Sequence, residues 1–235
     1  MNQLSSYLAT VAPFAHIPRE EVEKIALVSQ VVHHAKGDIL YGEGEDADAY
    51  WVLQTGKAFI LKYQADGKPL VIDTVSAGNL LIMMDQLGSK LTVYPCSAVA
   101  WSDTTTVRIP HRYFESAFAN YPSMVANVFE ICSRQLSRLR ERVIVYQEPV
   151  RKRVARTLFD LQRKEGMVLP YTSRRDISTL AATSVETTIR VIRDFQKKHW
   201  ISSVGGCLRL QDILHLRALI NDKKQLQDSS ATLSH

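Results

Sequence analysis

The chain has few cysteines and no long apolar run. Only Cys96, Cys132 and Cys207 occur among 235 residues, an odd and scattered set that argues against a disulfide framework and suits a reducing compartment. Three cysteines are also too few for a four-cysteine iron–sulfur cluster. No apolar stretch reaches the roughly 18 residues of a membrane span, and the first residues lack a basic segment followed by an apolar block. These absences predict a cytoplasmic protein with no iron–sulfur cluster and no membrane partner.

The sequence also lacks the motifs of common enzyme classes. It contains no Gly-rich phosphate loop and no recognisable Ser-His-Asp arrangement. A cupin-like metal oxygenase would need two or three histidines and a carboxylate that converge inside a barrel. His33 and His34 are adjacent, so on a strand their side chains point to opposite faces. We therefore expect a protein that is not an enzyme.

Charge is unevenly spread along the chain. Residues 1–148 hold 13 Lys and Arg against 16 Asp and Glu, a net charge of −3, whereas residues 149–235 hold 16 against 8, a net charge of +8. A basic C-terminal third is the electrostatic footprint of a module that binds phosphates. A basic face that is only solvated is the alternative interpretation.

Two types of periodicity divide the N-terminal half. Residues 1–30 form short amphipathic segments, and Pro18 marks a helix start. Between residues 31 and 110, short apolar runs alternate with turn residues about every 8–12 positions, which predicts an antiparallel sandwich or barrel. Asp66-Gly67 lies between two such runs and predicts a hairpin. The runs are Ile39–Tyr41, Tyr50–Leu53, Ala58–Leu61 and Leu70–Ile72.

Residues 122–147 change to helical periodicity. Apolar residues recur there in alternating steps of four and three, which is the a/d pattern of a helix that pairs with another helix. Because two-fold pairing is the commonest solution, we expect a homodimer. The alternative is a helix packed on its own domain. The predicted dimer seam consists of Val125, Phe129, Cys132, Leu136, Leu139, Val143 and Tyr146.

The C-terminal region has the pattern of a winged helix-turn-helix. A helix over residues 150–165 stops at Gly166, and a strand-like segment follows at residues 167–169. Two close helices come next, one from Arg174 to Ala182 and a second whose start Ser184 is predicted to cap through its hydroxyl. A wing is expected around Gly205-Gly206, and residues 221–235 form a polar tail.

The second of these helices has separate apolar and polar faces. Ile189, Ile192 and Phe195 are predicted to pack inward, as are Ile177, Leu180 and Ala181 of the first helix. Glu186 and Arg190 are four residues apart and share the opposite face, where arginine can bind guanine and glutamate can accept from cytosine or adenine. A surface Glu–Arg pair without DNA contact is the alternative. The predicted phosphate contacts are Thr183, Ser184, Thr187, Arg193, Lys197 and Lys198.

These segments resemble the cyclic-AMP receptor protein and fumarate–nitrate regulator (Crp/Fnr) superfamily over about residues 12–215. The similar motifs are Lys36–Glu45, Tyr50–Lys57, Val185–Arg190 and Phe195–Lys197. The resemblance implies an α+β fold with four parts. An N-terminal cyclic-nucleotide-binding-like β-barrel (double-stranded β-helix) spans residues 1–121, and a long dimerisation helix spans 122–147. A winged helix-turn-helix spans 148–220, and a tail spans 221–235.

The resemblance also implies a transcription regulator that binds double-stranded DNA and RNA polymerase. Glu186 and Arg190 match the family's base-reading glutamate and arginine. Val185 stands where the cyclic-AMP branch has another arginine, which favours a TTGAT-like half-site. Ile189 stands where the fumarate–nitrate branch usually has serine, and this leaves the outer base of the half-site open. The sequence does not decide between activator and repressor.

The expected effector pocket lacks the anchors of a cyclic nucleotide. That branch of the family uses a Gly-Glu-Leu turn and a following arginine, whereas this chain has Gly78-Asn79-Leu80 and neither arginine nor glutamate from Asn79 to Val107. Cyclic AMP is therefore not the expected effector. The pocket segment is apolar and consists of Leu80, Leu81, Ile82, Met83, Met84 and Leu87, together with Cys96 and Ser97.

Besides a redox signal and a protein partner, three effector hypotheses remain open. Haem, with or without a bound gas, would need ligands from His16, His33, His34, His111, Met83, Met84 or Cys96. A small organic molecule suits an apolar pocket. A constitutive DNA binder whose barrel has lost its ligand is the third. In the first two, effector binding would shift the dimer toward the arrangement that binds DNA.

Overall fold

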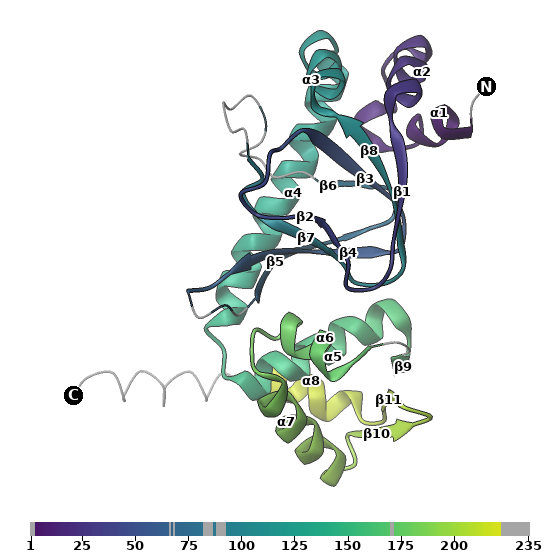
Figure 1. The fold of residues 1–235 in the computed structure, drawn as a ribbon. Helices are drawn as coiled ribbons and strands as arrows, with labels where there is room; N and C mark the ends of the chain where they lie inside the picture. Colours follow the sequence, from purple (N-terminus) through teal and green to yellow (C-terminus); the bar gives the residue numbers. More distant parts are fainter. Residues whose placement is uncertain are drawn as a thin grey trace. The chain divides into compact units, whose positions relative to one another are not determined.

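The computed structural model describes residues 3–65, 67, 69–81, 87, 93–169 and 172–221. The chain divides into two compact units, Met1–Leu139 and Arg140–His235. Figure 1 shows strands and covering helices in the first unit and mostly helices in the second. Three predicted pocket residues, Ile82, Met83 and Met84, lie outside the described residues, as does the tail after Asn221.

Short helical segments begin the first unit. They are α1 (Gln3–Leu8), the 3-10 helix η1 (Ala12–Phe14) and α2 (Arg19–Val28). Pro18 directly precedes α2, and two glutamates lie in its first turn, where the helix dipole favours negative charge. The helix start that Pro18 predicts is therefore confirmed.

In the described part of the chain, eight strands follow and form two four-stranded sheets, with the orders β1-β8-β3-β6 and β2-β7-β4-β5. Figure 1 shows the two sheets facing each other. The pairing of β4 with β5 in an antiparallel register confirms the predicted hairpin. The strands are β1 (Gln30–His34), β2 (Ile39–Tyr41), β3 (Ala49–Thr55), β4 (Lys57–Tyr63), β5 (Pro69–Ser76), β6 (Asn79–Leu81), β7 (Ser97–Ala100) and β8 (Thr104–Pro110).

Strand β3 is buried on both faces. Val52 packs in a cluster with the covering helices, whereas Trp51 and Leu53 pack in a second cluster between the sheets. Because alternate side chains point to opposite faces, such a strand has a continuous apolar sequence. Gly56 follows with a φ of +81°, and a Cβ there would lie 2.4 Å from the carbonyl oxygen of Asp103. Only glycine therefore fits the turn between β3 and β4.

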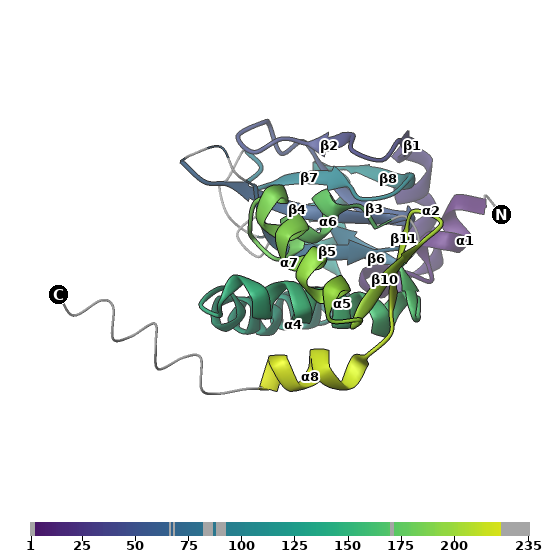
Figure 2. The same cartoon turned by 90° about the horizontal axis from the view of Figure 1, so that it is seen from below.

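Two helices complete the first unit and lead out of it. They are α3 (His111–Asn120) and α4 (Pro122–Tyr146), and α4 confirms the helix predicted over residues 122–147. Met124, Val128 and Ile131 of α4 are buried in the cluster that contains Val52 of β3. Figure 2 shows α4 running along the strands. The first part of α4 therefore packs on its own domain, which was the alternative to a pure pairing helix.

The second unit has the elements of a winged helix-turn-helix. Helix α5 ends at Glu165, and Gly166, whose φ is +91°, stops it as predicted. Strands β10 and β11 pair on either side of Gly205-Gly206, and β9 adds to β11; the β10–β11 hairpin is visible in Figure 2. The elements are α5 (Val150–Glu165), β9 (Val168–Leu169), α6 (Arg174–Leu180), α7 (Val185–Lys197), β10 (Ile201–Val204), β11 (Cys207–Leu210) and α8 (Ile213–Asn221).

Two details differ from the sequence predictions. Helix α6 ends at Leu180 rather than Ala182, because Ala182 has a φ of +47° and leaves the helical region. Helix α8 was not predicted. The residue in the sequence that could have predicted the start of α8 is Asp212. Its carboxylate accepts a hydrogen bond from the backbone N–H of His215 at 3.0 Å, as an N-cap residue does.

Candidate functional site

Ser184 fixes the start of α7. Its hydroxyl oxygen accepts a hydrogen bond from the backbone N–H of Thr187 at 3.1 Å, which satisfies one of the free donors of the first turn. The Thr188 hydroxyl donates to the Ser184 carbonyl oxygen at 3.0 Å. The predicted cap is confirmed, and α7 therefore begins at a defined residue.

The burial pattern of α7 separates an inner face from an outer one. Thr188, Ile192 and Phe195 are buried, whereas Glu186 and Arg190 are exposed. Ile189 is only half-buried, so the predicted inward position belongs to Thr188. Thr188 lies one turn before Ile192 on the same face of the helix. It can be buried because its hydroxyl donates a hydrogen bond to the Ser184 carbonyl oxygen.

Glu186 carries its negative charge over a wide pH range. Hydrogen bonds from its own backbone N–H and from the Ser184 side chain lower the pKa of Glu186 below its ordinary value. The N-terminal end of a helix dipole favours a carboxylate as well. An exposed, ionised carboxylate at this position can accept hydrogen bonds from amino groups of bases.

The other predicted DNA contacts lie at the surface of the second unit. Arg193, Lys197 and Lys198 are exposed, and Val185, Thr183, Ser184 and Thr187 are half-buried. Lys198 also lies 5.1 Å from the centre of the Trp200 ring. These positions leave cationic groups free to approach phosphates, whose contacts set the register of a protein on DNA.

The end of α7 is joined to the wing by side-chain contacts. The Gln196 amide donates to the Ser203 hydroxyl of β10 at 2.9 Å. Trp200 stacks on His215 of α8, with ring centres 5.6 Å apart, and Arg151 of α5 lies over the same tryptophan at 5.8 Å. Sequence reasoning missed this cluster, because its members come from three separate segments.

An exposed stripe of apolar side chains runs along the surface of α4. Phe129 is 70% exposed, and Val125, Leu136 and Val143 are also exposed. Leu139 and Tyr146 are half-buried. Cys132 differs from the predicted seam, since it is only 2% exposed and packs in the core of its own domain. The face that contains Met124, Val128 and Ile131 also takes in Cys132, so this residue offers little surface to a second helix.

The residues predicted to line an effector pocket are divided between two clusters. Leu80 and Leu87 pack with the covering helices, whereas Leu81 and Cys96 pack between the sheets. Consecutive strand residues point to opposite faces, so Leu80 and Leu81 cannot line one cavity. Ser97 is buried, and its hydroxyl accepts a hydrogen bond from the backbone N–H of Glu43 at 2.9 Å.

Aromatic side chains occupy the space between the sheets. Tyr41 and Tyr94 stack with ring centres 4.0 Å apart, and the Trp51 indole N–H donates to the Tyr94 hydroxyl at 3.0 Å. That hydroxyl donates in turn to the Ala49 carbonyl oxygen at 2.8 Å. Within the described part of the chain, the buried Tyr41 hydroxyl has no hydrogen-bond partner, and burial raises the pKa of Tyr41.

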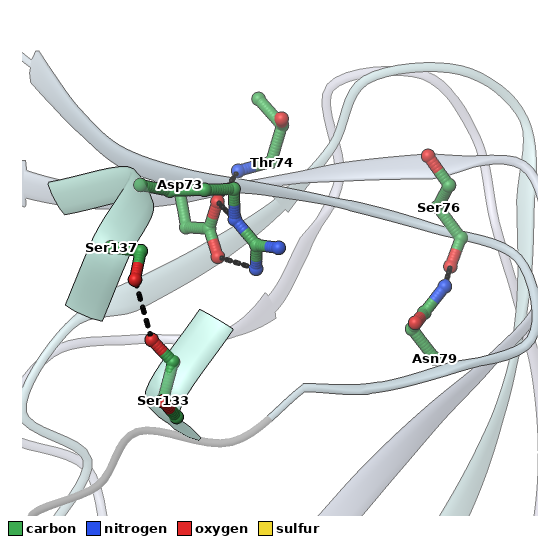
Figure 3. Close-up of polar contacts among 7 residues, drawn as sticks. Asp73, Thr74, Ser76, Asn79, Ser133 and Ser137 are labelled. Atoms are coloured by element: carbon green, nitrogen blue, oxygen red, sulfur yellow. Dashed lines mark hydrogen bonds and ion pairs between the residues drawn. The ribbon is translucent and has the colours of Figure 1, made fainter. Parts of the chain in front are cut away.

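The side chain of Asn79 closes the turn between β5 and β6. The Asn79 amide donates to the carbonyl oxygens of Ser76 and Ala77, at 3.1 and 3.2 Å; the first of these bonds is drawn in Figure 3. The amide group is therefore used within the β5–β6 turn. Asn79 lies in the stretch that corresponds to the Gly-Glu-Leu turn of the cyclic-nucleotide branch of the Crp/Fnr superfamily, which this sequence resembles.

A buried carboxylate joins β5 to α4. Asp73 is 3% exposed and accepts two hydrogen bonds from Arg138, from Nε at 3.1 Å and from Nη2 at 2.7 Å. The backbone N–H of Thr74 adds a third bond at 2.8 Å, as Figure 3 shows. A bidentate Arg–carboxylate pair fixes orientation as well as distance. Sequence reasoning missed it, because the two residues are 65 positions apart.

The candidate haem ligands have other surroundings. The ring nitrogens of His33 and His34 lie 3.0 Å from the hydroxyls of Thr105 and Thr106 on β8, and desolvation lowers the pKa of His34. His16 is exposed and His111 half-buried. The described residues include no group of three or more His, Cys, Asp or Glu suited to a metal ion. None of the helices in that part of the chain is long and apolar enough to cross a membrane.

Known protein families match both units. The family described as "Cyclic nucleotide-binding domain" matches residues 31–121, and that described as "Crp-like helix-turn-helix domain" matches residues 152–219. A curated relative, the CRP-like cAMP-activated global transcriptional regulator of Mycobacterium tuberculosis (strain CDC 1551 / Oshkosh), is 23% identical over 225 residues, which are 89% of this chain and 96% of that protein.

Other similarities are shorter or concern the fold alone. Neuropathy target esterase sws of Drosophila willistoni is 26% identical over 137 residues, which are 56% of this chain but only 9% of that protein. A solved structure from Eubacterium rectale, assigned to the Crp/Fnr family, has a TM-score of 0.76 at 16% identity and covers 89% of this chain and 97% of its own.

The two family matches follow each other along the chain in the order of a sensing domain and a DNA-binding domain, and together they span more than half of it. The family consists of regulators rather than enzymes. The fold agrees, with an N-terminal sheet domain, a long helix and a C-terminal helix-turn-helix. The chain belongs to the Crp/Fnr family of DNA-binding transcription regulators.

Proposed function

We propose that this regulator reads DNA with Glu186 and Arg190 of α7. The observation that carries the proposal is their exposure on the face opposite Thr188, Ile192 and Phe195, on a helix whose start is fixed by Ser184. An inward apolar stripe with a few exposed polar side chains is what a helix in the major groove needs. The family membership and the basic C-terminal third of the chain support the same assignment.

The exposed stripe of α4 supports a homodimer. Its apolar side chains would leave water when two copies of α4 pair, and a two-fold axis would place two α7 helices in successive major grooves. The operator should then be a near-palindrome with half-site centres about 34–36 Å apart. We further infer a cytoplasmic protein that works with RNA polymerase, because it belongs to a family of bacterial transcription regulators.

We infer that the effector is not a cyclic nucleotide. A cyclic phosphate needs a guanidinium fork and N–H donors, and no arginine occurs between Asn79 and Val107. The Asn79 amide is used within its own turn. The side chains between the sheets are mostly aromatic and aliphatic, and the buried Tyr41 hydroxyl has no hydrogen-bond partner in the described part of the chain. A small, largely apolar molecule with one hydrogen-bonding group fits this chemistry better.

A DNA selection experiment tests the proposed function. Purified protein would be used to select bound duplexes from a random pool, and the selected sequences would be compared. We expect an inverted repeat of TTGAT-like half-sites, because Val185 replaces an arginine of the cyclic-AMP branch. Selected sequences without two-fold symmetry, or no enrichment at all, would contradict the proposal.

A regulator that needs no effector is the second candidate. The observation that favours it is the aromatic cluster of Tyr41, Trp51 and Tyr94 between the sheets, in which Trp51 and Tyr94 bond each other. The same selection distinguishes the candidates when it is repeated with protein that has been unfolded in urea, dialysed and refolded. Unchanged operator affinity would favour the effector-independent regulator, and a loss of affinity would favour a bound effector.

We propose that the Asp73–Arg138 pair couples the barrel to α4. Asp73 lies in β5, and Arg138 lies in α4 between the stripe residues Leu136 and Leu139 in the sequence. A shift of β5 would therefore be passed to the helix that pairs the two protomers. Such coupling requires a connection between two elements whose arrangement both sites influence.

Replacing Arg138 by glutamine is expected to loosen this end of α4. Asp73 would remain buried without its partner, at a cost of about 1–3 kcal/mol in the free energy of unfolding. Hydrogen exchange of the α4 backbone should become faster, and operator affinity should fall severalfold. The matched control is Arg134→Gln, because Arg134 pairs with Glu130 on the exposed side of the same helix, where an ion pair contributes little. Equal exchange rates in the two variants would refute the coupling.

A further inference from the structure

The turn between α6 and α7 contains a residue in an unfavourable conformation. Ala182 has a φ of +47°, in the left-handed region that side chains other than glycine, asparagine and aspartate rarely adopt. Local bonds close the turn, from Ala182 N–H to the Thr179 carbonyl oxygen at 3.3 Å and from Thr183 N–H to that of Ser178 at 3.0 Å. The conformation of Ala182 sets the direction in which the chain enters α7.

Arg153 of α5 holds this turn from outside. Its Nη1 donates to the carbonyl oxygen of Ala182 at 3.1 Å. The guanidinium is partly desolvated, and this burial lowers the pKa of Arg153. Its buried Nε has no acceptor within reach in the described part of the chain. The bond to Ala182 is therefore a main polar contact of a half-buried, charged side chain, and hydrogen bonds of charged groups are stronger than neutral ones.

The same end of α5 also holds the far part of α7. Arg151, two residues before Arg153, forms an ion pair with Asp194 at 2.6 Å and lies 5.2 Å from the centre of the Phe195 ring. Helix α5 itself is firmly packed, since Val154, Ala155 and Leu158 are fully buried. Two arginines thus attach α7 to one rigid helix, one before its first turn and one near its last.

We propose that Arg153 is a positioning residue for DNA recognition. It acts through the Ala182 carbonyl, which it holds in the left-handed turn, and so fixes the angle at which Glu186 and Arg190 are presented. The proposal rests on the proposed role of α7 in reading DNA. It goes beyond that role, because Arg153 belongs to neither helix of the α6–α7 motif.

The test compares Arg153→Met with Arg153→Lys in the full-length protein. Binding to the selected operator and to a scrambled duplex is measured over a range of salt concentrations, and thermal unfolding reports the folded state. Arg153→Met should weaken operator binding on the order of tenfold, because the free protein would then have to order the α6–α7 turn when it binds DNA. Scrambled DNA should be bound as before, and the lysine variant should keep part of the operator affinity.

Two further variants separate positioning from other roles. Arg163→Met removes an exposed arginine of the same helix and controls for the loss of one positive charge. Ala182→Gly, added to Arg153→Met, should restore part of the operator preference, because glycine adopts a positive φ without cost. This rescue also remains informative if Arg153→Met alone is poorly stable.

Each outcome supports or overturns the proposal. An equal loss on both duplexes with a smaller salt slope would show that Arg153 binds phosphate instead. A lower unfolding temperature with unchanged operator preference would show a purely structural role. If α7 does not read DNA, Arg190→Ala would leave the preference unchanged, and the proposed function would fail. If only the inference about Arg153 is wrong, the Arg190 variant would still lose the preference.

Discussion

Replacing Arg190 by alanine is expected to remove operator preference and to leave weak, salt-sensitive DNA binding. A bidentate arginine–guanine contact provides about 1–3 kcal/mol of discrimination against a wrong base. A symmetric dimer makes the contact twice, so the expected loss is about 2–6 kcal/mol in the free energy of specific binding. Binding to scrambled DNA depends on phosphate contacts and should change far less. Titration of both duplexes at two or more salt concentrations measures the effect.

Arg193→Ala is the matched control for this variant. Arg193 is exposed on the same helix but is predicted to contact phosphate. Its loss should weaken binding to all sequences by a similar factor and reduce the salt slope by about one per contact. If Arg190→Ala kept full operator discrimination, or if the two variants behaved alike, α7 would not be the base-reading helix.

Replacing Phe129 by glutamate is expected to separate the dimer into monomers. Phe129 is 70% exposed at the middle of the α4 stripe, so the change leaves the fold of one chain largely intact. In the dimer it would place a carboxylate from each protomer in an apolar interface, where an unpaired charge is costly. Operator binding should fall by several orders of magnitude, because two linked half-site contacts become two independent ones. Analytical ultracentrifugation and operator titration measure both effects.

Leu27→Glu is the matched control for the dimer prediction. Leu27 is 76% exposed on α2, so the control introduces the same carboxylate at an equally exposed apolar position outside the stripe. It should remain dimeric and bind the operator normally. A dimeric Phe129→Glu protein with normal operator affinity would show that the protomers pair through another surface.

The sequence determined the features that depend on neighbouring residues. The helix start after Pro18, the stop at Gly166, the Ser184 cap and the wing turn at Gly205-Gly206 all follow from local backbone preferences. The exposure of Glu186 and Arg190 follows from helical spacing alone. The family motifs were also evident, because they extend over consecutive residues.

Only the tertiary structure decided which faces are covered and which distant groups meet. The heptad spacing of α4 does not reveal that Cys132 faces its own sheet, and an apolar segment does not reveal that Leu80 and Leu81 belong to different clusters. The Arg138–Asp73 and Arg153–Ala182 contacts join residues 65 and 29 positions apart. The periodicity of the sequence predicts which face of a helix or strand is buried. Which residues cover that face depends on how the strands and helices pack. For this reason the base-reading candidates could be named from the sequence, whereas the groups that hold them in place required the structure.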